Sequence, residues 1–159
     1  MNDSPRKVLV SACLLGRKVR YDGTGATDVD HVLARWRDEG RIVMVCPEVS
    51  GGLSTPRPPA EAVGERVVTV DGVDVTAAFE RGAEVALQLA REHDVALAVL
   101  KARSPSCGST NVYDGTFSGE LRPGQGVTAR VLRAHGIAVF SEETLAQAQD
   151  YLRSQIGDC

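Results

Sequence analysis

The sequence predicts an α/β fold of three layers, in which a doubly wound, mainly parallel sheet carries helices on both faces and a small β-hairpin lies outside it. Two observations lead to this prediction. Short, continuous apolar runs alternate with segments of helical period along the 159 residues, and such runs are typical of parallel strands that are covered on both faces. In addition, a segment of alternating polarity surrounds Asp71-Gly72, a dipeptide that favours a two-residue hairpin turn.

Four apolar runs are predicted as the strands of the sheet, at residues 7–12, 41–45, 95–100 and 137–140. Four amphipathic segments are predicted as helices, at residues 28–39, 76–93, 126–135 and 142–155. Gly40 is a stop signal for the first helix, and Thr76 is a candidate cap for the second. We expect the hairpin at residues 65–76 and a long loop at residues 51–59, which are rich in Pro and Gly.

The composition is that of an ordinary globular protein, with 43% hydrophobic and 25% charged residues. We expect one domain over residues 1–159, with its core at about residues 6–153. The net charge of −3 gives no basic field for nucleic acid, so a small molecule is the expected partner. No apolar run resembles a signal peptide or spans a bilayer. We therefore expect a cytoplasmic protein with reduced thiols and no membrane partner.

Three of the four cysteines share a position in this pattern. Cys13 and Cys46 directly follow apolar strands, and Cys107 follows a third strand after a short loop. In open parallel sheets, ligands bind beyond the carboxyl ends of the strands, so we expect these thiols at one edge of the sheet. The alternative is three structural cysteines, because free cysteine is often buried. Cys159 is the last residue, and we assign it no role.

Three thiolates can hold zinc or an iron–sulfur cluster. The sequence has no closely spaced cysteine pair of the kind found in structural zinc sites, and its histidines, His31, His93 and His135, fall on predicted helices or at their ends. A site with three protein ligands leaves one coordination position open, as catalytic metal sites do. Residue types and spacing alone do not choose iron over zinc.

Polar residues lie near the cysteines. Glu48 is a candidate for proton transfer, and Ser104 and Ser106 offer hydroxyl groups. The alternatives are an exposed glutamate and a helix cap. Three basic residues, Arg20, Arg57 and Lys101, are expected near the same edge and could bind a polar ring, although solvated surface charge is the ordinary role of such residues.

At these positions the sequence resembles the DUF523 family, whose characterised members are thiouracil desulfidases. The resemblance covers nearly the whole chain. The matching segments are Cys13-Leu14-Leu15-Gly16, Val19-Arg20-Tyr21-Asp22-Gly23, Cys46-Pro47-Glu48, Gly51-Gly52-Leu53, Pro56-Arg57, and residues 101–108 and 112–117.

The resemblance implies a [4Fe-4S] cluster held by Cys13, Cys46 and Cys107, with one iron open to the substrate. It implies proton transfer by Glu48 and Ser104 and removal of sulfur from a 2- or 4-thiouracil-like base, the sulfur being captured by the open iron and released as sulfide without net redox. The expected substrate contacts are Arg20, Tyr21, Arg57, Lys101 and Ser106. In an aerobic preparation, Zn²⁺ or an empty site would be the alternative.

Other functions remain open at this point. Cys107 could serve as a nucleophile or redox thiol without any metal. The protein could also be a sulfur or metal carrier without catalytic activity. Binding of thiolated tRNA is disfavoured by the acidic balance and by an aromatic content of 4%, because single-stranded RNA is usually held by stacking.

Overall fold

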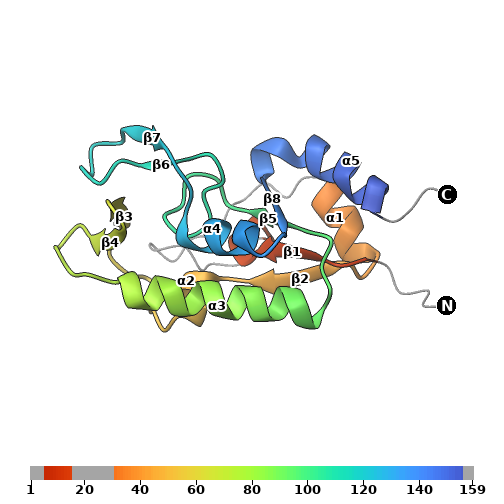
Figure 1. Cartoon of the computed structure of the whole chain (residues 1–159), viewed down its shortest axis with the longest axis horizontal. Coiled ribbons are helices and arrows are strands. Elements are labelled where there is room, and N and C mark those ends of the chain that lie inside the picture. Colours follow the sequence, from red (N-terminus) through yellow and green to blue (C-terminus); the bar gives the residue numbers. More distant parts are fainter. Residues whose placement is uncertain (1–5, 16–30, 156–159) are drawn as a thin grey trace.

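The computed structural model describes residues 6–15 and 31–155 (Figure 1). Its centre is a four-stranded parallel sheet of order β2-β1-β5-β8. The strands are β1 (Val8–Ser11), β2 (Ile42–Val45), β5 (Leu97–Leu100) and β8 (Ala138–Ser141). β1 pairs with β2 on one side and with β5 on the other, and β5 pairs with β8. The predicted parallel sheet is confirmed.

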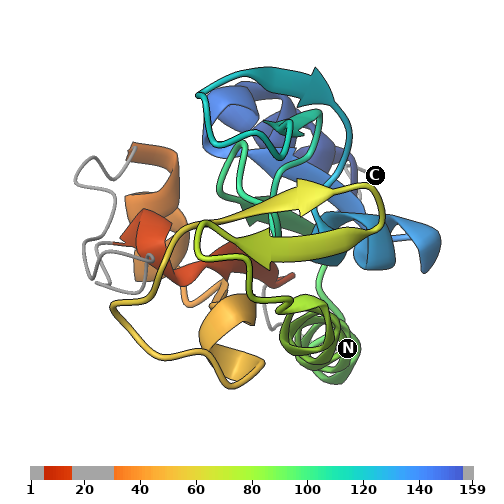
Figure 2. The same ribbon diagram turned by 90° about the vertical axis from the view of Figure 1, so that its left-hand side faces the viewer.

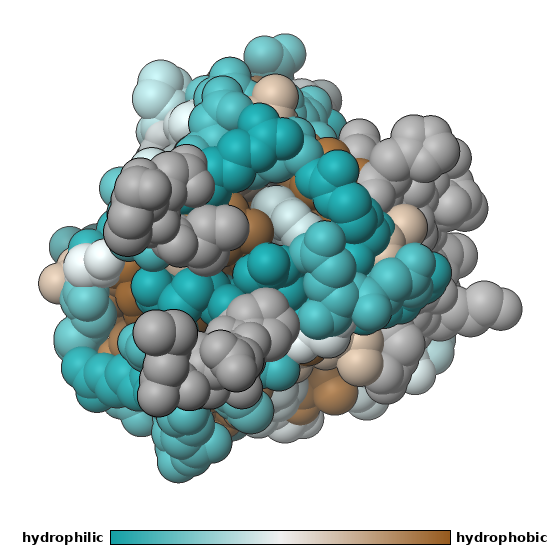
Figure 3. Space-filling view, turned by 90° about the vertical axis from the view of Figure 1, so that its right-hand side faces the viewer, coloured by the Kyte–Doolittle hydropathy of each residue, from teal (hydrophilic) through white to brown (hydrophobic). Residues whose placement is uncertain are grey.

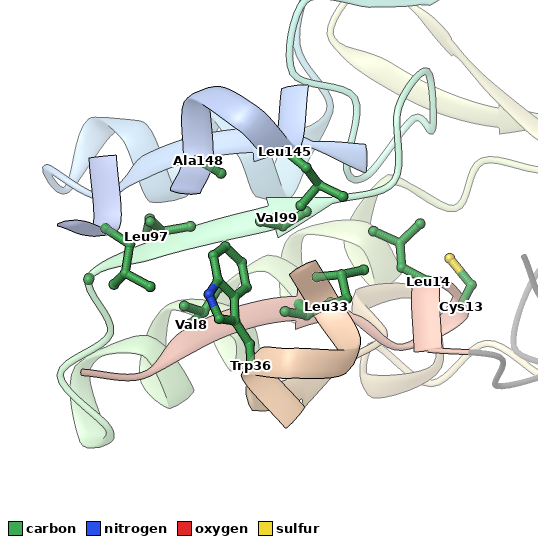
Figure 4. Packing of buried hydrophobic residues seen from close by; sticks show 12 residues of the cluster. Val8, Cys13, Leu14, Leu33, Trp36, Leu97, Val99, Leu145 and Ala148 are labelled. Carbon is green, nitrogen blue, oxygen red and sulfur yellow. The ribbon is translucent and has the colours of Figure 1, made fainter. Parts of the chain in front are cut away.

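Helices cover both faces of this sheet, as the fold class requires. One face carries α1 (His31–Asp38) and α5 (Leu145–Gln155). Their buried side chains, among them Leu33, Trp36 and Leu145, pack on Leu97 and Val99 of β5 (Figure 4). Because the strands bury side chains on both faces, their sequences are continuously apolar.

The other face carries α3 (Thr76–Glu92) and α4 (Val127–Ala134). Small buried residues of α3, including Ala86 and Ala90, share a core with Leu132 of α4 and with Ala98 of β5. Thr76 does not cap α3, because its hydroxyl bonds to Val67 and Asp74. The Asp74 carboxylate instead accepts a hydrogen bond from the N–H of Thr76 at 2.9 Å.

A hairpin is present as predicted, but its longer ladder begins before the predicted residues 65–76. Its strands are β3 (Ala60–Val63) and β4 (Arg66–Thr69), and Gly64 lies in the turn with a φ of 63°. Asp71-Gly72 does form a turn, yet only an isolated bridge, between Val68 and Asp74, follows it. β4 is thus paired with β3 and also bridged to the chain after Asp71-Gly72, and that chain enters α3 instead of continuing as a strand.

Several short elements were not predicted. They are η1 (Ala12–Leu15), α2 (Pro47–Ser50), the antiparallel pair β6 (Asn111–Tyr113) and β7 (Leu121–Pro123), and η2 (Glu142–Thr144) before α5. Both hairpins project at the same end of the molecule (Figures 1 and 2). At the opposite end, hydrophilic side chains predominate on the part of the surface that is described (Figure 3).

None of the helices in residues 6–15 and 31–155 is long and apolar enough to cross a membrane.

Candidate functional site

A cavity of about 540 Å³ lies beyond the carboxyl ends of β1, β2 and β5. Its volume falls within the range of pockets that hold small molecules. The strand order reverses between β1 and β5, and ligands of doubly wound sheets bind at such a switch point. The lining comes from strand ends, from the loop after β5 and from both hairpins: Ser11, Ala12, Cys13, Val45, Cys46, Pro47, Glu48, Pro59, Ala60, Glu61, Val70, Lys101, Ala102, Arg103, Ser104, Pro105, Cys107, Tyr113, Phe117 and Gly119.

Cys13, Cys46 and Cys107 all line this cavity. Cys13 lies in η1 immediately after β1, Cys46 lies between β2 and α2, and Cys107 lies in the loop after β5. Cys13 and Cys107 are buried, and Cys46 is half-buried. The parallel strands thus bring together residues that are up to 94 positions apart (107 minus 13). Their role as ligands remains a prediction.

The environment of Cys107 disfavours a free thiolate. Ser11 donates a hydrogen bond to its Sγ at 3.5 Å and accepts one from the N–H of Lys101 at 3.0 Å. Burial raises the pKa of Cys107 to about 12, outweighing the hydrogen bond from Ser11, which lowers it, and the nearby Cys13, Glu48 and Cys46 add to the rise. Burial also raises the pKa of Cys46. A bound metal cation would favour the thiolate form instead, because a thiol that coordinates a metal loses its proton.

The donor set fits a cluster better than a single ion. Zinc binds thiolates at about 2.3 Å, which draws all its ligands around one point. Over residues 6–15 and 31–155, no three His, Cys, Asp or Glu side chains form a group that could hold one metal ion. The cysteines of an iron–sulfur cluster bind different iron atoms and therefore need not meet at one point. Three soft sulfur donors around one cavity meet that requirement.

Glu48 lies in the first turn of α2 and is not an exposed loop residue. Its Oε2 accepts a hydrogen bond from Arg57 Nη2 at 2.8 Å, and the side chains are 20% and 5% exposed, respectively. Arg57 Nη1 also donates to the carbonyl oxygen of Ser54 at 3.0 Å and to Thr55 Oγ1 at 2.9 Å. Arg57 does not line the main cavity. The structure therefore gives it a positioning contact to Glu48 where we expected a substrate contact.

Two glycines allow α2 to rest directly on α3. A Cβ at Gly51 would overlap the carbonyl oxygen of Ala78, and a Cβ at Gly82 would overlap that of Pro47. Arg81 of α3 also donates to the carbonyl oxygen of Gly51, at 3.0 and 3.2 Å. The backbone after Cys46 is thus fixed by contact with a long helix.

Ser104 begins the turn that presents Cys107. Its Oγ accepts hydrogen bonds from the N–H groups of Ser106 and Cys107, both at 3.1 Å, and its carbonyl oxygen accepts from Gly108 N at 2.8 Å. The hydroxyl group caps this single turn, and no helix follows it. Ser104 lines the cavity, and its hydroxyl proton is still available for donation because both contacts use it as an acceptor.

The sequence of this chain also matches a known protein family. Residues 8–144 match the model of the 2-thiouracil desulfurase family. The chain belongs to this family. The prediction of a desulfidase-type enzyme of the DUF523 group is therefore confirmed.

Two individual proteins show the same relationship. An uncharacterized protein, YbbK of Bacillus subtilis (strain 168), is 43% identical over 148 residues, which cover 87% of this chain and 97% of that protein. A solved structure of TudS, a [4Fe-4S]-dependent thiouracil desulfidase, matches with a TM-score of 0.87 and 54% identity, covering 89% of this chain and 94% of that one.

The basic residues of the loop after β5 are bound by acidic residues of η2. Lys101 Nζ donates to Glu142 Oε2 at 2.6 Å, and the N–H of Ala102 donates to Glu142 Oε1 at 2.8 Å. Arg103 Nη1 donates to Glu143 Oε2 at 2.9 Å. Lys101 lines the cavity as expected of a substrate contact, but its ammonium group already has a carboxylate partner.

Ser106 does not lie where a substrate contact would require. It is buried, its hydroxyl bonds to Thr128 Oγ1 at 2.8 Å, and it does not line the main cavity. The turn after Ser104 directs this side chain towards α4. The remaining expected contacts, Arg20 and Tyr21, lie outside the described residues, as does Cys159.

Among the cavity residues that were not predicted from the sequence are Ser11, Glu61, Tyr113 and Phe117. Tyr113 and Phe117 belong to a segment that matches the family, but no chemical pattern marked them. Ser11 is the one polar residue in the run of β1. Glu61 lies beside the apolar part of the hairpin, and nothing in the sequence distinguishes it from a surface glutamate.

Proposed function

We propose that this protein removes sulfur from a thiolated pyrimidine, 2- or 4-thiouracil being the substrate class, by a hydrolysis without net redox. The observation that supports this most is that three thiols, a carboxylate and a hydroxyl group line one cavity at the switch point of the sheet. Membership of the 2-thiouracil desulfurase family and the likeness to TudS support the same substrate class.

Cys13, Cys46 and Cys107 would hold a [4Fe-4S] cluster through three of its irons. Such a cluster supplies, when bound, an iron without a protein ligand that is a Lewis acid with affinity for soft sulfur. The chain supports it with the hydrogen bond from Ser11 to Cys107 Sγ, since hydrogen bonds to cluster sulfurs tune their electronic properties.

Glu48 serves as the general base in this proposal. Arg57 fixes one carboxylate oxygen at 2.8 Å, so the other can accept a proton from a water molecule in the cavity. The water oxygen then attacks the ring carbon that carries the sulfur. Ser104 donates a hydrogen bond to the ring and relays a proton, while its lone pairs stay on the two N–H groups of its turn.

The atoms of this reaction balance without an oxidant or reductant. A carbon–oxygen bond forms from water, the carbon–sulfur bond breaks, and sulfur leaves with the two protons of water as hydrogen sulfide. Thiouracil thereby becomes uracil, and no electrons are gained or lost overall.

The metal-free alternative has less support. A catalytic cysteine needs a lowered pKa, whereas burial raises the pKa of Cys107 to about 12. That alternative also gives no role to Cys13 and Cys46. A carrier function would not require a carboxylate held by an arginine on the wall of the same cavity.

The test is sulfide release by the anaerobically reconstituted protein. With 2-thiouracil and 4-thiouracil, we expect sulfide and uracil in equal amounts, with no electron donor added. The apoprotein is the control. Turnover by the apoprotein would favour the thiol mechanism, and a holoprotein that binds sulfur but releases no uracil would favour a carrier.

A further inference from the structure

Glu61 is a buried carboxylate on the cavity wall for which the proposed reaction has no use. It lies in β3, is 9% exposed and lines the cavity. Burial of a carboxylate is costly unless hydrogen bonds compensate it. Its contacts therefore indicate what it does.

One oxygen of Glu61 holds the segment after β6. Oε1 accepts hydrogen bonds from Gly115 N at 2.9 Å and from Phe117 N at 3.2 Å. Gly115 has a φ of 94°, and a Cβ there would lie 2.6 Å from the carbonyl oxygen of Ala62. Phe117 has a φ of 57°, which is unfavourable for a bulky residue. Glu61 thereby fixes Phe117 in this conformation at the cavity wall.

The other oxygen of Glu61 is available to a ligand. Among the residues that the structure describes, none donates a hydrogen bond to Oε2. Oε2 is nevertheless not among the fully buried polar atoms without a partner in this part of the chain, so it keeps some accessible surface. Glu61 lines the cavity, and a ligand there is the partner that this oxygen could take. A carboxylate oxygen in this position is a strong hydrogen-bond acceptor.

We propose that Glu61 is a specificity residue whose Oε2 accepts a hydrogen bond from a ring N–H of the substrate, a cyclic thioamide, while Tyr113 and Phe117 flank the ring. This inference rests on the proposed function. A thiolated pyrimidine carries N–H groups beside its thiocarbonyl carbon, and these match an acceptor. A ring alkylated at both nitrogens would leave the carboxylate unpaired, which is how polar sites reject analogues.

The test pairs one substitution with one ligand change. Glu61→Gln keeps an amide oxygen for Gly115 and Phe117 but presents an amide N–H group to the cavity. We expect it to weaken the binding of uracil, measured by calorimetry on the reconstituted protein, and to raise KM in turnover assays with the thiolated base, each by about tenfold or more, the range for a lost charge-assisted hydrogen bond. The dimethylated analogue 1,3-dimethyluracil has no ring N–H, and its affinity should not change. The steric effect of the methyl groups is the same in the wild type and in Glu61→Gln. It therefore cancels when the two proteins are compared with both ligands.

Glu65→Gln is the matched control, because Glu65 is exposed in the turn of the same hairpin; it should leave Kd, KM and Tm unchanged. Equal values for Glu61→Gln and wild type, or equal losses for both ligands, would overturn the inference while leaving sulfide release by the wild type intact. Wild-type binding of 1,3-dimethyluracil as tight as that of uracil would overturn it without any variant. If the wild type released no sulfide from either 2-thiouracil or 4-thiouracil, both this inference and the proposed function would fail.

Discussion

The pairing of Glu48 with Arg57 shows how much of this site depends on contacts between individual residues. The sequence placed Glu48 near the thiols, but it did not show that Arg57, nine positions later, would hold it. That pairing depends on the path of residues 51–59, which form no helix or strand. The planar guanidinium bonds to Glu48 through Nη2 and to Ser54 and Thr55 through Nη1, so it ties the carboxylate to this loop.

We predict that Glu48→Gln retains the cluster but has a much lower kcat. General-base catalysis contributes about 10²–10⁴-fold, so kcat should fall by that factor, while visible absorption and iron content remain as in the wild type. Arg57→Lys keeps the positive charge but loses the planar group that bonds to Glu48 and to the loop at Ser54 and Thr55 together. Its kcat should therefore lie between those of the wild type and Glu48→Gln. Turnover of Glu48→Gln at the wild-type rate would exclude Glu48 as the base.

Ser11 and Glu61 explain why some site residues escaped prediction. A serine in an apolar strand and a glutamate in a hairpin are ordinary in sequence. Ser11 gains its role only because β1 pairs with β5, which brings it to Cys107 and to the N–H of Lys101. The cysteines, in contrast, were predictable because each follows a strand whose apolar sequence identifies it.

Among the secondary-structure elements, α2 is positioned by backbone contact with α3. Gly51 and Gly82 lie where the two helices meet, and neither position has room for a Cβ. The sequence predicted α3 from its apolar period, but it gave no sign that Gly82 was more than a weak point in a helix. Cys46 and Glu48 owe their place to this contact.

We predict that Gly82→Ala destabilises the protein, opposite to the usual effect. Gly→Ala within a helix normally stabilises by about 0.5–1 kcal/mol, but here the new Cβ would overlap the carbonyl oxygen of Pro47. Overpacking of this kind costs about 1–3 kcal/mol, and the displacement of α2 should also lower kcat. Glu84→Ala on the exposed side of α3 is the control. A higher Tm for Gly82→Ala, measured by thermal unfolding, would show that the helices are not locked together.

The arrangement of the sheet makes the whole molecule suitable for a shared site. With β1 between β2 and β5, the three cysteine-bearing strand ends are neighbours. This much followed from the sequence, because continuous apolar strands that alternate with helices imply a parallel sheet. The hairpin of β6 and β7 did not, because its short strands at residues 111–113 and 121–123 have no marked alternation.

The proposed desulfuration depends on Cys13, Cys46 and Cys107 holding one cluster together. The direct measurement is iron and acid-labile sulfide per chain after anaerobic reconstitution, in the wild type and in single Cys→Ala variants. We predict a full [4Fe-4S] complement in the wild type and in Cys159→Ala, the matched control, and loss of cluster and activity in each of the other three variants. Full iron content in Cys13→Ala, Cys46→Ala or Cys107→Ala would contradict the account.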